Sequence, residues 1–187
     1  MGLLGGSFNP AHGGHLHISR LAIQKLGLDQ IWWLVSPQNP LKPVSGMMRL
    51  EQRVETAKTA ATDPRIRVTD IEAQLGTQFT LDTLNSLKQL FPNNKFVWLM
   101  GADNLAQMPH WRRWKALMNA VPIAVLGRPT YSLRALNSLA AQRFRRQRLR
   151  AHRTRGLVYG KPATWCFISG PLHPGSATEI RRVNVED

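Results

Sequence analysis

The sequence predicts an α/β fold in which a doubly wound parallel sheet carries helices on both faces. Strand-like and helix-like segments alternate along the chain, which is the pattern of consecutive strand–helix units. The strand-like segments are short apolar runs rich in residues that favour strands. No internal repeat and no change of composition marks a second domain, and 187 residues suffice for one compact domain over residues 1–187.

Six apolar runs are expected to form the strands, and they lie at residues 2–4, 31–35, 66–71, 96–100, 121–126 and 164–168. Helices are expected between them, at residues 15–26, 47–61, 80–90, 111–119 and 132–152. The first helix is followed by Gly27, a residue that readily adopts the left-handed conformation of a helix end. Because such sheets bind ligands beyond the carboxyl ends of their strands, we expect the site in the loops that follow the strands.

The composition favours a soluble protein of the reducing cytoplasm. The one cysteine, Cys166, excludes an internal disulfide and a zinc-ribbon site. No stretch is long enough without charge to span a bilayer, and the N-terminus lacks the basic and cleavage regions of a signal peptide. The formal net charge is +14, of which eight arginines within residues 134–155 supply +8 and leave +6 for the rest. This modest remaining balance suits an enzyme that handles polyanionic nucleotides.

The segment after the first strand has the layout of a phosphate-binding loop. Its glycines let the backbone approach an anion, and the helix that follows supplies free N–H groups. Neither the P-loop pattern nor the G-x-G of dinucleotide-binding loops occurs in the chain. Instead, His12 and His15 stand three residues apart at the helix start and can point into the same space. There they could donate hydrogen bonds to phosphate oxygens that gain negative charge in a displacement at phosphorus.

This loop resembles the HxGH signature of the nucleotidyltransferase superfamily, and its Asn-Pro-x-His portion resembles the nicotinate-nucleotide adenylyltransferase branch. The resemblance implies a Rossmann-like nucleotidyltransferase fold and catalytic roles for His12 and His15. The loop residues that it assigns to ATP and its phosphates are Gly5, Gly6, Ser7, Phe8 and Gly14. The residues alone leave two alternatives open, a chance pair of helix-start histidines and one arm of a zinc site.

A second motif of the same superfamily stands near the end of the chain. Ser176, Thr178 and Arg181 are similar to the S-x-T-x-x-R motif that holds the ATP phosphates, and they can offer hydroxyls, N–H groups and a guanidinium to one anion. Taken alone, the pattern also fits an ordinary helix N-cap. The sequence departs from the family at Gly175, where an apolar residue is usual, and at Ala177, where a hydroxyl is common.

Three middle segments resemble the nicotinate branch of the superfamily. They are the loop at residues 33–42, the helix start at residues 79–84, in which Phe79 replaces the family's tyrosine, and residues 98–114. The residues that this resemblance assigns to nicotinate mononucleotide are Asn39, Lys42, Thr80, Trp111, Arg112 and Arg128. The prolines of the first segment also fit a stiff surface turn.

The third of these segments carries the expected nucleoside contacts. The resemblance implies that Gly101 and Asp103 lie near the ATP ribose and adenosine, that Trp111 stacks on the pyridine ring, and that backbone around Arg112 binds its carboxylate. Such stacking is favourable because an electron-poor aromatic cation packs well on indole. The spacing of Trp111 and Trp114 also fits a core stripe on a helix. We assign Trp111 to the ligand and Trp114 to the core.

The motifs together imply adenylyl transfer from ATP to nicotinate mononucleotide, which gives deamido-NAD and pyrophosphate, a step of NAD biosynthesis. Mg²⁺ is expected as an ion held mainly by phosphates and water, because no acidic cluster indicates a protein metal site. The alternative is a transferase of the same superfamily that uses nicotinamide mononucleotide. A non-enzymatic nucleic-acid-binding protein ranks last, because it leaves both histidines and the C-terminal motif unexplained. Homo-oligomerisation stays open.

The proposed reaction does not require the basic block at residues 143–155. The block contains Arg143, Arg145, Arg146, Arg148, Arg150, Arg153 and Arg155. Helical spacing favours a solvated helix with an apolar face that packs inward. The residues of that face are Leu133, Leu136, Leu139, Ala140 and Phe144. A site for RNA or another polyanion, or a self-association contact, is the alternative, although the block lacks the aromatic interleaving of single-strand binders.

Overall fold

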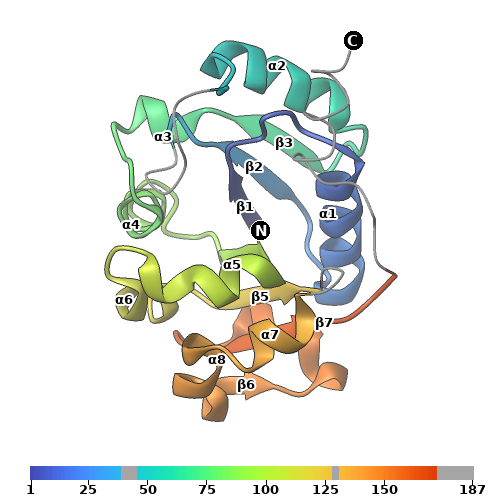
Figure 1. The fold of residues 1–187 in the computed structure, drawn as a ribbon, viewed down its shortest axis with the longest axis vertical. Helices are drawn as coiled ribbons and strands as arrows, with labels where there is room; N and C mark the ends of the chain where they lie inside the picture. The colour runs from blue at the N-terminus through green and yellow to red at the C-terminus, as the bar shows by residue number, and fades with distance from the viewer. Residues whose placement is uncertain (39–45, 128–130, 172–187) are drawn as a thin grey trace.

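The chain folds around one parallel sheet (Figure 1). The computed structural model describes residues 1–38, 46–127 and 131–171. In this part of the chain seven strands lie in the order β3-β2-β1-β4-β5-β7-β6, and every neighbouring pair is parallel. Helices lie on both sides of the sheet. The predicted doubly wound α/β fold is therefore confirmed.

All six predicted runs form strands. The strands are β1 (Gly2–Gly6), β2 (Ile31–Val35), β3 (Ile66–Thr69), β4 (Val97–Gly101), β5 (Ile123–Leu126), β6 (Arg148–Leu149) and β7 (Trp165–Ile168). The first extends further than predicted, so Gly5 and Gly6 belong to the strand rather than to the loop. The third ends early because the chain turns into the short helix α3 (Ile71–Gln74). The edge strand β6 is not among the predicted strands.

The helices form two layers that pack on opposite faces of the sheet. One layer contains α1 (Gly13–Leu26), α2 (Leu50–Ala60) and the 3₁₀ segment η3 (Ala151–Tyr159). The other contains α3, α4 (Thr80–Leu90), α5 (Ala102–Gln107), η1 (Met108–His110), α6 (Trp114–Met118), α7 (Ser132–Leu136) and α8 (Leu139–Arg143). Successive residues of a strand point to opposite faces, so Leu3 packs under the second layer and Leu4 under the first. Among the described residues, no helix is both long and apolar enough to cross a membrane.

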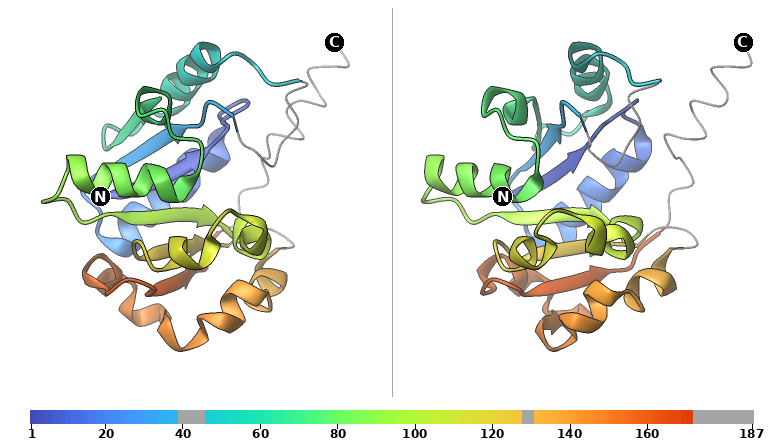
Figure 2. Two further views of the ribbon diagram at one scale, coloured as in Figure 1. Left: turned by 90° about the vertical axis from the view of Figure 1, so that its left-hand side faces the viewer. Right: turned by 60° about the vertical axis from the view of Figure 1, so that its left-hand side comes forward.

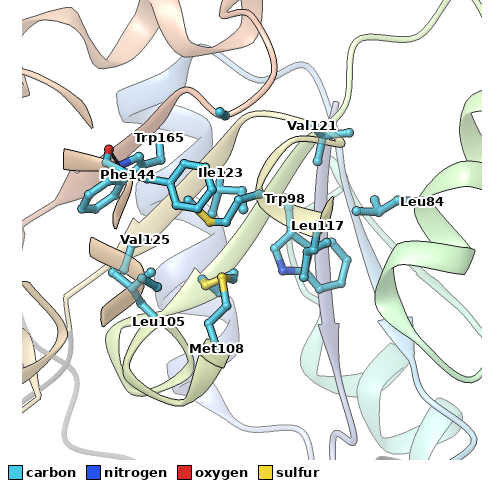
Figure 3. Packing of buried hydrophobic residues seen from close by; sticks show 14 of the residues in the cluster. Leu84, Trp98, Leu105, Met108, Leu117, Val121, Ile123, Val125, Phe144 and Trp165 are labelled. Atoms are coloured by element: carbon cyan, nitrogen blue, oxygen red, sulfur yellow. Dashed lines mark hydrogen bonds between the residues drawn. The ribbon is translucent and has the colours of Figure 1, made fainter. Parts of the chain in front are cut away.

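Tryptophans on the sheet anchor the second layer. Figure 3 shows Trp98 of β4 and Trp165 of β7 among apolar side chains that include Leu105 of α5. The indole Nε1 of Trp165 donates a hydrogen bond of 2.8 Å to the carbonyl oxygen of Phe144, at the end of α8. This bond fixes the point at which the chain leaves α8 and turns toward the edge of the sheet.

The long helix predicted at residues 132–152 is wrong. The segment forms α7, α8, the 3₁₀ turn η2 (Arg145–Gln147), β6 and the start of η3. Leu133 and Leu139 are 78% and 62% exposed, so they do not form the inward face expected of one helix. Phe144 is buried, but its carbonyl oxygen accepts the Trp165 bond where the helix ends. A tertiary contact therefore interrupts the predicted periodicity.

The helix predicted at residues 111–119 is shorter than expected. Helix α6 begins at Trp114 because Arg113 has a φ of 52°, in the left-handed region. Trp111 and Trp114 therefore do not share one helix face, and the argument from their spacing does not apply. Trp114 meets Phe144 edge to face with ring centroids 6.0 Å apart, which fits its assignment to the core.

Gly5 is required by close packing. A Cβ atom on Gly5 would overlap the ring atom Cη2 of Trp98, whereas a Cβ atom on Gly6 would lie 3.4 Å from Cε2 of Phe8. We expect Gly5→Ala to lower the free energy of unfolding by about 1–3 kcal/mol, because Trp98 is buried and cannot yield without repacking. Gly6→Ala is the matched control and should lower the free energy of unfolding much less. Urea unfolding measures both variants, and equal losses would contradict this account of the packing.

Candidate active site

The strand order reverses beside β1, which makes the carboxyl ends of β1 and β4 a topological switch point. The chain winds from β1 outward through β2 and β3 and then returns to β4 on the other side of β1. Open α/β sheets bind ligands at such switch points. The loop between β1 and α1 lies on one side of this point. On the other side lie Gly101, the N-cap of α5, and Asp103 in its first turn. The structure thus brings together two segments that the sequence assigns to ATP.

His12 and His15 form the N-terminal cap of α1. Nδ1 of His12 accepts a hydrogen bond of 3.1 Å from the N–H of Gly14. Nδ1 of His15 accepts one of 3.2 Å from the N–H of His12. A neutral imidazole that accepts at Nδ1 carries its proton on Nε2. The two ring centroids are 4.0 Å apart, so the rings lie side by side, as their spacing predicts.

A buried network supports His15 from the sheet. Trp33 of β2 donates from Nε1 to Oγ of Ser19 at 2.8 Å, and Ser19 donates from Oγ to the carbonyl oxygen of His15 at 2.8 Å. The ring centroid of Phe8 lies 4.7 Å from that of His15 and 5.2 Å from that of Trp33. Phe8 is 2% exposed, so its side chain packs beneath the histidine and only its backbone can face a phosphate.

The guanidinium of Arg53 ties the loops of the site together. Arg53, on α2, is 1% exposed. It donates hydrogen bonds to the carbonyl oxygens of Ser7 at 2.7 Å, Ser36 at 2.7 Å, Pro37 at 2.9 Å and Met48 at 2.9 Å. Burial lowers the pKa of Arg53 from its ordinary value. Because Ser7 follows β1 and Ser36 follows β2, one side chain fixes the carboxyl ends of two adjacent strands.

Asn9 adds a second tie between the same loops. Its Nδ2 donates a hydrogen bond of 2.9 Å to the carbonyl oxygen of Gly46, and its Oδ1 accepts one of 3.1 Å from the N–H of Met48. Since Arg53 also binds Met48, the start of the α2 segment is held to the β1–α1 loop at two points.

Several residues that support the site have no role assigned to them from the sequence. Among them are Asn9, Ser19, Trp33 and Arg53. A signal for Arg53 exists, because it occupies a position of the buried face of α2. Leu50, Val54 and Ala57 share that face at helical spacing, and a charged residue among them indicates a special partner. The partners of Ser19 and Trp33 depend on the tertiary fold and have no comparable signal.

Thr80 and Arg112, both assigned to the mononucleotide, lie in segments that meet. Thr80 is the first residue of α4. The guanidinium of Arg112 lies 4.5 Å from the ring centroid of Phe79 and 3.6 Å from the carboxylate of Asp82, so the start of α4 holds this side chain. Trp111 is half-buried against the core, and its Nε1 is buried with no hydrogen-bond partner among the described residues.

A buried carboxylate links the loop after β2 to α4. Glu72 of α3 accepts hydrogen bonds from Oγ1 of Thr83, at 3.2 Å, and from the side chain of Ser36. Burial raises the pKa of Glu72, and both hydrogen bonds oppose that shift. Because Ser36 also offers its carbonyl oxygen to Arg53, polar contacts run without a break from the β1–α1 loop to α4.

Some assigned residues lie outside the described part of the chain, and their roles stay predictions. They are Asn39, Lys42, Arg128, Ser176, Thr178 and Arg181. Among the residues that are described, no group of three or more His, Cys, Asp or Glu side chains could hold a metal ion. A zinc site built on His12 and His15 would therefore have no third protein ligand among the described residues.

The chain matches known proteins over nearly its whole length. The sequence profile of the cytidylyltransferase-like family matches residues 3–183. A probable nicotinate-nucleotide adenylyltransferase of Parvibaculum lavamentivorans is 52% identical over 181 residues, which are 97% of this chain and 90% of that protein. A protein of the same name from Gluconobacter oxydans is 50% identical and covers 97% of this chain and 93% of its own length.

Solved structures show the same fold. The nicotinic acid mononucleotide adenylyltransferase of Plasmodium falciparum, complexed with NaAD, has a TM-score of 0.67 at 17% identity over 97% of this chain and 82% of that chain. Its complex with APC has a TM-score of 0.65 at 16% identity over 97% of this chain and 81% of that chain. The fold is therefore Rossmann-like, as in nucleotidyltransferases. From the profile match and the identity to its sequence relatives, this chain belongs to the nicotinate-nucleotide adenylyltransferase family.

Proposed function

We propose that the protein transfers the adenylyl group of ATP to nicotinate mononucleotide, which yields deamido-NAD and pyrophosphate. The observation that carries this proposal is the pair of imidazoles at the start of α1, beside the switch point of the sheet. Relatives that are 52% and 50% identical bear the name of this activity. The reaction is a step of NAD biosynthesis.

The reaction is a displacement at the α-phosphorus of ATP. A phosphate oxygen of the mononucleotide forms the new P–O bond while the bond to pyrophosphate breaks, so no covalent enzyme intermediate is needed. In the proposed mechanism His12 and His15 present their Nε2–H groups to the oxygens on which negative charge builds up. The dipole of α1 adds to this stabilisation, because the helix begins at the same place.

The remaining ATP contacts are proposed from both sides of the switch point. Backbone of the β1–α1 loop approaches the phosphates, and Gly101 and Asp103 contact the nucleoside. Ser176, Thr178 and Arg181 hold the outgoing pyrophosphate. Magnesium enters as part of the substrate, Mg-ATP, since its usual ligands are phosphate oxygens and water.

The mononucleotide is proposed to bind on the side of α4. Thr80 and backbone near Arg112 take the nicotinate carboxylate, and Trp111 stacks on the pyridine ring. Asn39, Lys42 and Arg128 make the remaining contacts with the mononucleotide. The contacts of the Arg112 side chain with Phe79 and Asp82 support this arrangement, because they bring the segment around Arg112 to the start of α4. The alternative substrate is nicotinamide mononucleotide. A cytoplasmic setting stays a prediction, and homo-oligomerisation stays open.

The first test compares the two mononucleotides. With Mg-ATP, we expect pyrophosphate release with nicotinate mononucleotide at a kcat/KM about 10²-fold or more above that with the amide, because an amide leaves carboxylate-binding donors unpaired. A coupled assay of pyrophosphate gives both values. Equal rates would contradict the substrate assignment, and release with neither would contradict the proposed reaction.

His15→Ala tests the proposed chemistry. The variant loses one donor to the phosphate oxygens, and we expect kcat to fall by about 10²–10³-fold. Loss of one half of the helix cap should lower the free energy of unfolding by only about 0.5–2 kcal/mol. His152→Ala, at an exposed position outside the site, is the matched control. Turnover of the His15 variant at the control's rate would remove the histidine from the mechanism.

Arg53→Lys tests the tie between the loops. Lysine keeps the charge but cannot reach four carbonyl oxygens with a planar fork, so we expect the free energy of unfolding to fall by about 2–4 kcal/mol. We also expect kcat/KM to fall by about tenfold or more when it is measured well below the melting temperature, because the loops lose their fixed spacing. Arg67→Lys, at an exposed position on β3, is the control. Unchanged kinetics in a destabilised Arg53 variant would limit Arg53 to a role in stability.

A further inference from the structure

The basic block at residues 143–155, called here the basic edge, wraps around one edge of the sheet. Its strand β6 is the outermost strand, whereas the switch point at the candidate site lies between β1 and β4. Helix α8 precedes β6 and packs on one face of the sheet, and η3 follows it and packs on the other. Figures 1 and 2 show this orange segment at one end of the molecule, opposite α2.

Nearly all of the net charge belongs to this half of the sequence. Residues 1–103 contain ten basic and eight acidic residues, a balance of +2. Residues 104–178 contain thirteen basic residues and no acidic residue. Within the described residues, all seven arginines of the basic edge are exposed and none forms an ion pair with a carboxylate. Such an asymmetry indicates a polyanionic partner.

The basic edge is part of the folded body. Phe144 and Leu157 are buried on opposite faces of the sheet. The hydrogen bond from Trp165 holds the carbonyl oxygen of Phe144. On the other face, Oγ1 of Thr154 donates a hydrogen bond of 3.2 Å to the carbonyl oxygen of Lys25 on α1. The guanidinium of Arg148 lies 5.3 Å from the ring centroid of Trp165. The arginines therefore stand on a fixed scaffold.

Two open hollows lie along the basic edge. One has a volume of about 460 Å³ and is lined by Gln142, Arg143, Arg145, Arg146 and Gln147. The next has a volume of about 420 Å³ and is lined by Arg148, Leu149, Arg150, His152 and Arg153. Three arginines line each hollow, and two glutamines join them in the first. Guanidinium groups bind phosphate oxygens, often in bidentate pairs. Two consecutive hollows of this kind suit an extended chain of phosphates.

The seven arginines are more than the sheet edge needs to avoid pairing with another chain. A short edge strand with one or two charged residues already resists pairing with another chain, and β6 has only two residues. A solvated helix face does not explain the arginines either, because they lie on α8, η2, β6 and η3 rather than on one helix.

We propose that the basic edge binds the phosphate backbone of duplex nucleic acid without sequence preference. The arginines lie on elements at both faces of one sheet edge, so they can reach the phosphates of two backbones across a groove. Binding to a bilayer surface usually needs an amphipathic helix, and α8 has only five residues. Stacking on single strands has no aromatic platform within residues 143–155, because the one Phe, Tyr or Trp side chain of this segment, Phe144, is buried. This function is independent of adenylyl transfer.

The test is fluorescence anisotropy with short labelled duplexes of two unrelated sequences. We expect equal affinity for both and a log–log dependence on salt with a slope between about −3 and −6, since each contacted phosphate contributes about −0.9. The combined variant Arg145→Gln, Arg146→Gln and Arg150→Gln should flatten the slope by about 2.7 and weaken binding by about 10²-fold at about 0.1 M salt. It should retain the adenylyl transfer rate of the unmodified chain.

The control removes the same charge elsewhere, with Lys58→Gln, Arg67→Gln and Lys88→Gln, all at exposed positions. Retained duplex binding in the control, together with loss in the edge variant, supports the proposal. Equal binding by the two variants would overturn it. So would tighter binding to a single strand of the same length, or to vesicles of phosphatidylserine and phosphatidylcholine. Absence of adenylyl transfer together with salt-dependent duplex binding would refute only the proposed enzymatic function.

Discussion

The buried guanidinium of Arg53 is the contact on which the geometry of the site depends. Removing a cation from water carries a large penalty, and in this protein four carbonyl oxygens offset it in place of a carboxylate. Those oxygens belong to backbone that is far apart in sequence, after β1, after β2 and before α2. None of these segments can shift alone without leaving a buried donor unsatisfied. The loops therefore behave as one unit, and Asn9 and Glu72 extend that unit toward α2 and α4.

The histidines depend on this unit and on the sheet beneath it. His15 is held by its own cap bond, by Ser19 through its carbonyl oxygen, and by the ring of Phe8. These contacts come from α1 and from the loop between β1 and α1, and Trp33 of β2 in turn holds Ser19, so the position of the imidazole reflects three elements. Stabilisation of charge in a transition state requires donors that are already in place. The packing beneath the histidines is therefore part of the proposed chemistry.

The sequence predicted the parts of the molecule that depend on local pattern. Apolar runs such as Ile31–Val35 became strands, and the glycine–histidine segment became the turn into α1. It failed where a tertiary contact or a local cap interrupts a regular pattern. The predicted helix at residues 132–152 contains Ser138, whose Oγ accepts a hydrogen bond from the N–H of Ala141 and starts a new helix. It also contains the carbonyl that Trp165 binds. Arg53 could be placed on a buried face, but its partners are set by loops that only the fold brings together.

The uneven distribution of charge gives the protein a strong electrical polarity. The net charge of +14 is concentrated toward the end that carries β6, while the acidic residues of the first 103 positions nearly balance their basic neighbours. A molecule of this kind is turned by the field of a nearby polyanion before it makes contact. The end with β6 arrives first, and the candidate site lies elsewhere, at the carboxyl ends of the central strands β1 and β4. A protein tethered in this orientation would leave that site open to small molecules from the surrounding solution.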